Sequence, residues 1–122
     1  MRLVPVLCAL LLATPLVATA QSSHHWNASN VALASGATLE VLIDWSQTRQ
    51  AMRQGWAERN PILGSHPSDG KLMVYNILAI GGNLGIGAAL PSRWRTVWFS
   101  TIAAVEAFTI AGNASLGLHV GF

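Results

Sequence analysis

Charged residues are scarce in this sequence. Seven Lys or Arg and five Asp or Glu make up 10% of its 122 residues, where soluble domains carry about 25%. Hydrophobic residues make up 52%, and the mean hydropathy is positive. A soluble domain of this length has a large surface to cover, and these charges are too few to cover it. The composition therefore favours a lipid bilayer as solvent, and the length allows one domain at most.

The sequence also lacks a large positive net charge. It has no cysteine beyond Cys8. Without Arg2, six basic residues face five acidic ones, and a net charge of +1 is too small and too dispersed to bind nucleic acid. The single cysteine, Cys8, lies inside the N-terminal apolar run, whereas a lipoprotein cysteine would follow that run. If this segment is removed, disulfides, cysteine metal sites and cysteine nucleophiles are all excluded.

Patterns for a metal ion or a cofactor are missing as well. His24 and His25 are adjacent but have no third ligand at metal spacing, so we interpret them as part of a solvated segment. The glycine-rich run 81–87 lacks the preceding strand and the lysine of a phosphate-binding loop. We therefore expect no metal and no cofactor.

Residues 1–20 have the pattern of an export signal. Arg2 supplies the positive start, the stretch 3–12 is apolar, Pro15 breaks the helix, and Ala18-Thr19-Ala20 fits the small-x-small cleavage rule. We expect cleavage after Ala20 and a mature N-terminus at Gln21. The alternative is an uncleaved signal-anchor, because residues 3–20 can just span roughly 30 Å of hydrocarbon.

Residues 21–122 predict a single all-α domain, a small helical membrane bundle with three apolar helices. The first helix is the weakest, because Glu40 and Asp44 interrupt it and each costs about 2.5–3.5 kcal/mol at mid-bilayer. A short extended tail closes the chain. The expected transmembrane helices are about 28–45, 72–90 and 93–112, and the polar connector is 46–71.

The ends of these helices carry their own signals. Trp45, Met52 and Trp56 recur at spacings of seven and four, which predicts that the first helix continues into the connector until Asn60-Pro61 stops it. Ser68 is expected to cap the second helix and Ser92 the third.

The basic residues predict an orientation. Arg49, Arg53, Arg59 and Lys71 lie in the connector, whereas the turn 91–96 carries two arginines. The positive-inside rule places the connector in the cytoplasm, and an exported N-terminus gives the same arrangement. We expect a multi-pass protein of the bacterial inner (cytoplasmic) membrane.

Each apolar segment carries polar residues on one face. Glu40 and Asp44 are four residues apart, and Glu106 and Asn113 are seven apart. At about 1.5 Å per residue, Glu40, Asn76 and Glu106 lie roughly 8–10 Å inside the leaflet that faces the connector. The sequence therefore predicts that they share one polar layer.

Two interpretations of this layer stay open. Intramembrane ionisable groups are candidates for proton handling, but these residues can also pair with one another and fix helix register, which we favour. Glu106 must be neutral or paired, and Arg49 is its first expected partner. The candidate cluster is Glu40, Asp44, Arg49, Glu58, Asn60, Glu106 and Asn113.

The connector resembles a family of short, uncharacterised membrane proteins of proteobacteria and phages. The resemblance rests on Asp44-Trp45-Ser46-Gln47-Thr48-Arg49, followed by Glu58-Arg59-Asn60-Pro61-Ile62-Leu63-Gly64 and Pro67-Ser68. Glu106 and Asn113 also match, and the similarity spans about residues 40–120. It implies a membrane topology and this choice of site residues, and it implies no known reaction.

Three functional hypotheses follow. The favoured one is a non-enzymatic structural or accessory subunit that associates with itself or with a larger membrane protein through the small residues Gly81, Gly85 and Gly87. The first alternative is an intramembrane enzyme or proton-coupled carrier that uses Asp44 and Glu106. The second is an outer-membrane-associated protein, because the tail 115–122 alternates in hydrophobicity and ends in Phe122.

Overall fold

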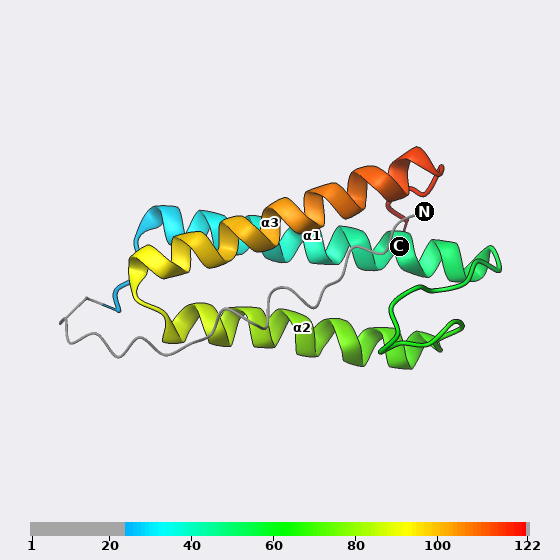
Figure 1. The fold of residues 1–122 in the computed structure, drawn as a ribbon, viewed down its shortest axis with the longest axis horizontal. Coiled ribbons are helices and arrows are strands. Elements are labelled where there is room, and N and C mark those ends of the chain that lie inside the picture. Colours follow the sequence, from blue (N-terminus) through cyan, green and yellow to red (C-terminus); the bar gives the residue numbers. More distant parts are fainter. Residues whose placement is uncertain (1–23, 122) are drawn as a thin grey trace.

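The computed structural model describes residues 24–121, which form three helices and no strand (Figure 1). The helices are α1 (Ala28–Arg53), α2 (Asp69–Ala89) and α3 (Ser92–Ser115). The predicted all-α architecture is therefore confirmed for this part of the chain. The predicted signal 1–20, its cleavage site and Phe122 lie outside the described residues.

The helices α1 and α3 run side by side in the same direction, and α2 runs opposite to both (Figure 1). Asn30 near the start of α1 bonds Thr96 near the start of α3. Asp44 in the second half of α1 bonds Asn113 near the end of α3. A tight turn at Pro91 joins α2 to α3, so the bundle goes up, down and up.

The start of α1 and α2 follows from side-chain caps. The Asn27 side chain accepts a hydrogen bond from the Asn30 amide at 2.8 Å. Ser68 accepts one from the Lys71 amide at 3.2 Å, so its predicted role as N-cap is confirmed. Each cap satisfies one of the amides that the first helical turn leaves without a partner.

Two boundaries differ from the sequence prediction. The helix α1 does continue into the connector, but it ends at Arg53, because Gly55 adopts a φ of +80° and turns the chain before Asn60. The prediction that Ser92 caps α3 is wrong. Pro91 occupies the N-cap position without a side-chain bond, and the Ser92 hydroxyl instead donates to Asn30 at 2.9 Å.

The tightest packing lies where α2 ends against α3. Phe99 is buried beside Ala34 and Ala37 of α1. A Cβ atom built on Gly87 would lie 2.4 Å from Cζ of Phe99, so this position accepts only glycine unless the ring moves. Gly87 therefore packs inside the chain, whereas the sequence predicted that it contacts a partner.

Polar side chains are unusually frequent inside the bundle, while apolar ones cover its outside. Leu39 of α1, Leu78 of α2 and Phe108 of α3 are 58%, 69% and 69% exposed. The largest fully buried side chain among residues 24–121 belongs to Arg95. The buried polar residues are Asn30, Ser46, Gln47, Asn76 and Arg95.

Of the helices in residues 24–121, α2 alone combines the length and the apolar composition of a membrane span. Only 17% of its most apolar stretch is buried inside the bundle. Glu40 and Asp44 interrupt the apolar sequence of α1, and Glu106 interrupts that of α3. The fold is thus three helices, one of which meets the criterion for a span on its own.

Candidate functional site

Asp44, Gln47 and Asn113 form a hydrogen-bonded polar cluster between α1 and α3. The Asn113 amide donates to the Asp44 carboxylate at 2.9 Å and to the Gln47 side-chain oxygen at 3.2 Å. The Gln47 amide in turn faces the carbonyl oxygens of Ile110 and Leu118, each at 3.4 Å. This arrangement joins α1, the end of α3 and the tail at one level.

Three further acids, Glu40, Glu58 and Glu106, lie near this cluster. Glu106 is half-buried on α3, and the charges that act on it are those of Asp44 and Glu40. Glu58 of the connector acts on Asp44 in the same way. One carboxylate oxygen of Glu40 is buried and has no hydrogen-bond partner in the described part of the chain. The structure therefore brings Glu40 and Glu106 close together, as the sequence predicted, and Asp44 lies beside them.

The expected partnership of Arg49 with Glu106 is wrong. The Arg49 guanidinium lies 3.7 Å from the Asp69 carboxylate at the start of α2 and 6.0 Å from the centre of the Trp45 ring. Arg49 follows Asp44 by five residues, which places the two side chains roughly 140° apart around the helix. Because Asp44 faces α3, Arg49 faces α2.

Glu58 and Asn60 organise the connector rather than a buried site. The Glu58 carboxylate accepts hydrogen bonds from the backbone amides of Arg59 at 2.7 Å and of Asn60 at 2.8 Å. The Asn60 side chain accepts from the Ile62 amide at 3.0 Å and donates to the Tyr75 hydroxyl at 2.9 Å. These two predicted site residues therefore fix the shape of a loop.

Asn76 is buried and makes no hydrogen bond to the acids of α1 and α3 among residues 24–121. Its amide donates to the Leu72 carbonyl at 2.8 Å, one turn earlier in α2. Such a bond satisfies the side chain within its own helix. The amide of Asn76 is thus satisfied within α2, and the hydrogen-bonded cluster is formed by side chains of α1 and α3.

A second polar centre surrounds Arg95, which the sequence did not lead us to expect. Its Nε donates to the Gly87 carbonyl at 2.7 Å and its Nη2 to the Leu90 carbonyl at 2.8 Å. Its Nη1 donates to the His25 carbonyl at 3.2 Å and to the Asn30 side-chain oxygen at 3.3 Å. One guanidinium therefore joins the segment before α1, the C-terminus of α2 and the start of α3.

The sequence did contain a signal for this centre. Arg95, Phe99, Ile102 and Glu106 recur at spacings of four, three and four, which marks one helix face. Arg95 lies next to Trp94, and an arginine beside a tryptophan is typical of the membrane surface. The helical spacing of Arg95 places it on the buried face of α3, whereas its residue type alone predicts a position at the membrane surface.

The small residues of α2 divide into two groups. Gly87 is in close contact with Phe99, as described above. Gly81 and Gly85 are exposed, and a Cβ atom added to either would have no neighbouring atom within 4 Å in the described part of the chain. Within residues 24–121, these two glycines therefore do not serve helix packing.

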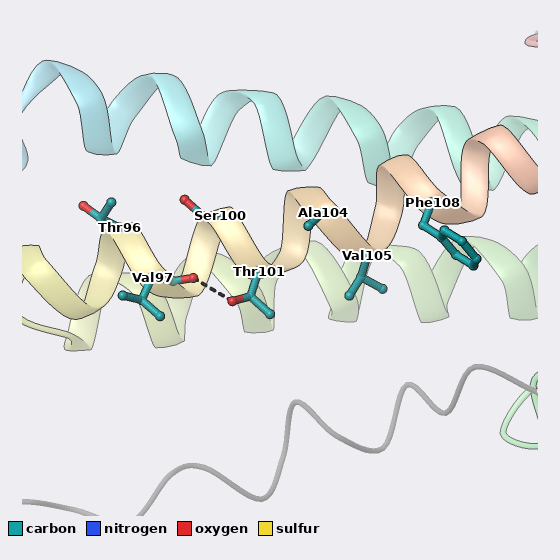
Figure 2. A pocket seen from close by; sticks show the side chains of 7 residues that line it. All are labelled: Thr96, Val97, Ser100, Thr101, Ala104, Val105 and Phe108. Carbon is teal, nitrogen blue, oxygen red and sulfur yellow. Dashed lines mark hydrogen bonds between the residues drawn. The ribbon is translucent and has the colours of Figure 1, made fainter.

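The outer face of α3 forms a shallow apolar groove (Figure 2). The hydroxyl of Thr96 donates to the Ser92 carbonyl at 3.2 Å, and that of Thr101 to the Val97 carbonyl at 2.9 Å. Because these hydroxyls are satisfied within the helix, the face presents mainly carbon to its surroundings. The lining residues are Thr96, Val97, Ser100, Thr101, Ala104, Val105 and Phe108.

The polar cluster consists of one acid and two amides, which can form hydrogen bonds, and the acid can exchange a proton. Within residues 24–121, no group of three His, Cys, Asp or Glu side chains is placed to hold a metal ion.

Comparison with known proteins adds no relative, because the chain matches no family model, no curated protein and no solved structure.

Proposed function

We propose that this chain is a non-enzymatic, three-helix integral membrane protein that acts as a structural or accessory subunit. The observation that carries the proposal is the distribution of polarity, with Arg95, Gln47 and Asn30 fully or almost fully buried and large apolar side chains exposed on every helix. Water favours the opposite distribution, and extensive exposed apolar surface marks contact with lipid or with another protein.

The spacing of charges along the bundle supports a bilayer-spanning arrangement. Between Lys71 and Arg93 the chain has no charged residue. The 19 residues 72–90 correspond to roughly 28 Å at the helical rise of about 1.5 Å per residue. That length is close to the thickness of the hydrocarbon core, about 30 Å.

The other two helices fit lipid because their acids face one another between the helices and the threonine hydroxyls of α3 are satisfied. Asp44 faces Asn113, and Glu106 faces the same interhelical level, instead of the apolar exterior. Intramembrane acids are placed toward the bundle interior in the same way. The threonine hydroxyls of α3 are bonded within the helix, which avoids the cost of an unsatisfied polar group in hydrocarbon.

The distribution of exposed arginines supports the proposed orientation in the inner membrane. At the α2–α3 turn, Arg95 is buried against carbonyl oxygens, which leaves Arg93 as the exposed arginine of that turn. At the other end, Arg53, Arg59 and Lys71 are exposed. The positive-inside rule therefore favours a cytoplasmic connector.

The association surface that we propose is the outer face of α2. Gly81 and Gly85 lie there one turn apart with open space above both. Small residues at this spacing let a second helix approach closely in lipid. The partner is a second copy or a helix of a larger membrane protein.

The test compares leucine substitutions on α2 and α3 in detergent and in vesicles. Gly81→Leu and Gly85→Leu fill the outer face, and Gly112→Leu is the matched control, because Gly112 is equally open but lies on α3. We expect the first two variants to lose oligomers or co-purifying partners while remaining folded. Equal behaviour of all three variants contradicts association through this face.

A second candidate is an intramembrane enzyme or proton-coupled carrier centred on Asp44 and Glu106. The observation that favours it is the unpartnered buried oxygen of Glu40 beside these two acids, within the described residues. Replacement of Glu106 by Gln separates the two functions. A variant that keeps its fold and oligomeric state but loses biological activity favours this chemical role, whereas retained activity favours the accessory role.

A further inference from the structure

The connector between α1 and α2 is held in one shape by its own polar side chains. Glu58 and Asn60 bind backbone amides of the loop, as described above. The Glu58 amide also donates to the Ser65 carbonyl at 2.8 Å, which closes the loop. The Lys71 ammonium donates to the Leu63 carbonyl at 2.7 Å and ties the loop to α2. The shape of the loop thus comes from several separate bonds.

In this loop, the neighbouring apolar residues Ile62 and Leu63 differ in burial. Leu63 is only 5% exposed, whereas Ile62 is 67% exposed. Gly64 permits the turn that follows, with a φ of +77°. Trp56, at the start of the connector, is 40% exposed. The connector therefore exposes Ile62 and Trp56, although it buries the neighbouring Leu63.

Basic side chains surround these apolar ones at the same end of the bundle. Arg53, Arg59 and Lys71 are exposed. Asp69 is paired with Arg49 at 3.7 Å, which leaves Glu58 as the one other acid of residues 53–71 against these three basic side chains. The Arg53 guanidinium has no ion-pair partner among residues 24–121. This end therefore presents a positive surface.

We propose that this surface, the connector tip (Arg53, Trp56, Arg59, Ile62 and Lys71), binds anionic phospholipid headgroups of the adjacent leaflet. Ile62 inserts among the upper acyl chains, Trp56 lies at headgroup level, and the basic side chains contact lipid phosphates. The inference rests on the proposed membrane location and adds a lipid class to it.

Charge and position favour a lipid surface over a protein partner. The connector tip ends where the charge-free segment 72–90 begins, which is the level of the headgroups if α2 spans the bilayer. Tryptophan and basic side chains at that level are typical of membrane anchors. Each basic residue near an anionic surface contributes about 1 kcal/mol to its attraction. The preformed loop reduces the cost of ordering Ile62 on binding.

The test uses the full chain in a Cys8→Ser background, reconstituted into vesicles of phosphatidylcholine alone or mixed with phosphatidylglycerol. An environment-sensitive fluorophore is attached through Ile62→Cys. Ser65→Cys is the matched control, because Ser65 is exposed on the same loop but is polar. We expect the label at position 62 to be shielded from water in the anionic vesicles, less so in zwitterionic ones and after addition of salt. The label at position 65 stays in water.

The charge contribution is tested with Arg53→Gln against Arg93→Gln, an equal change of charge at the opposite end of the bundle. Arg53→Gln should lower the ratio of shielded to exposed label about fivefold, and Arg93→Gln should leave it unchanged. Equal shielding in both lipids, or equal effects of both substitutions, overturns the proposal. So does shielding that depends on protein concentration in detergent, which indicates a protein interface. Failure of the protein to float with either vesicle contradicts the membrane location itself.

Discussion

The guanidinium of Arg95 lies 4.4 Å from the centre of the Trp26 indole ring and is fully shielded from solvent. Its hydrogen-bond partners among residues 24–121 are carbonyl and amide oxygens rather than a carboxylate. Several of these carbonyls belong to the C-terminus of α2, where the helix dipole is negative. The positive charge is therefore stabilised by partial charges from α2, by the face of Trp26 and by the segment before α1.

We predict that Arg95→Met destabilises the protein by about 3 kcal/mol or more, because it leaves the Leu90 carbonyl without a donor and removes the shorter of the two hydrogen bonds to the Gly87 carbonyl. Arg95→Lys should lower stability less than Arg95→Met does, although one ammonium group cannot make all the hydrogen bonds of the planar guanidinium. Arg93→Met, on the exposed side, is the control and should change stability little. Thermal unfolding in detergent measures all three. An equal loss for Arg93→Met and Arg95→Met refutes the role of Arg95.

We predict that Gly87→Ala destabilises the protein by about 1–3 kcal/mol, because its methyl group would lie 2.4 Å from the Phe99 ring. Phe99→Leu should partly relieve the clash, so the double variant should unfold closer to the single Phe99→Leu variant than additivity predicts. Gly85→Ala has open space above it and serves as control. The same unfolding assay applies. A Gly85→Ala loss as large as that of Gly87→Ala contradicts the packing.

We predict that Arg49→Leu and Glu106→Leu act independently, because Arg49 faces Asp69 and Glu106 faces other acids. Arg49→Leu should cost less than about 1 kcal/mol, as expected for a pair in which the Asp69 side chain is 65% exposed. Glu106→Leu should not lower stability, since it removes repulsion. Their effects in the double variant should add. Recovery of a large single loss in the double variant would instead indicate that the two residues pair.

The helices were predictable because their signals are local. The predicted ranges 28–45, 72–90 and 93–112 overlap α1, α2 and α3, and Ser68 caps α2 as its sequence context indicates. The end of α1 was harder, since Gly55 outweighs the periodicity of Trp45, Met52 and Trp56. The role of Ser92 depends on Asn30, which is 62 residues away in the sequence, and no local pattern reveals it.

The candidate site was predictable only in part. Asp44 and Asn113 meet, and Glu106 lies near Asp44, because helical spacing fixes which residues share a face. The partner of Arg49 was predicted wrongly, because depth alone was considered and the rotation of the side chain around α1 was not. Whether three of these helices span a membrane is a property of their surroundings, and it stays a prediction.

We predict that the connector lies in the cytoplasm. Single cysteines at Ser65→Cys and Arg93→Cys, in a Cys8→Ser background, report the two ends of the bundle to an impermeant thiol reagent in intact cells. Arg93 is preferable to Ser92, whose hydroxyl bonds Asn30. Labelling is expected at position 93 and not at position 65 until the cells are opened. The reverse pattern would invert the orientation.

The most direct test of the three-helix membrane domain places a spin label at the middle of each helix in reconstituted vesicles. Leu39→Cys, Leu78→Cys and Val105→Cys replace side chains that are 58%, 69% and 40% exposed. Collision with oxygen, which concentrates in lipid, is compared with collision with a water-soluble nickel chelate. We expect oxygen to dominate at all three positions. Dominance of the nickel chelate at Leu39 or Val105 would show that α1 or α3 lies in water and would contradict the account.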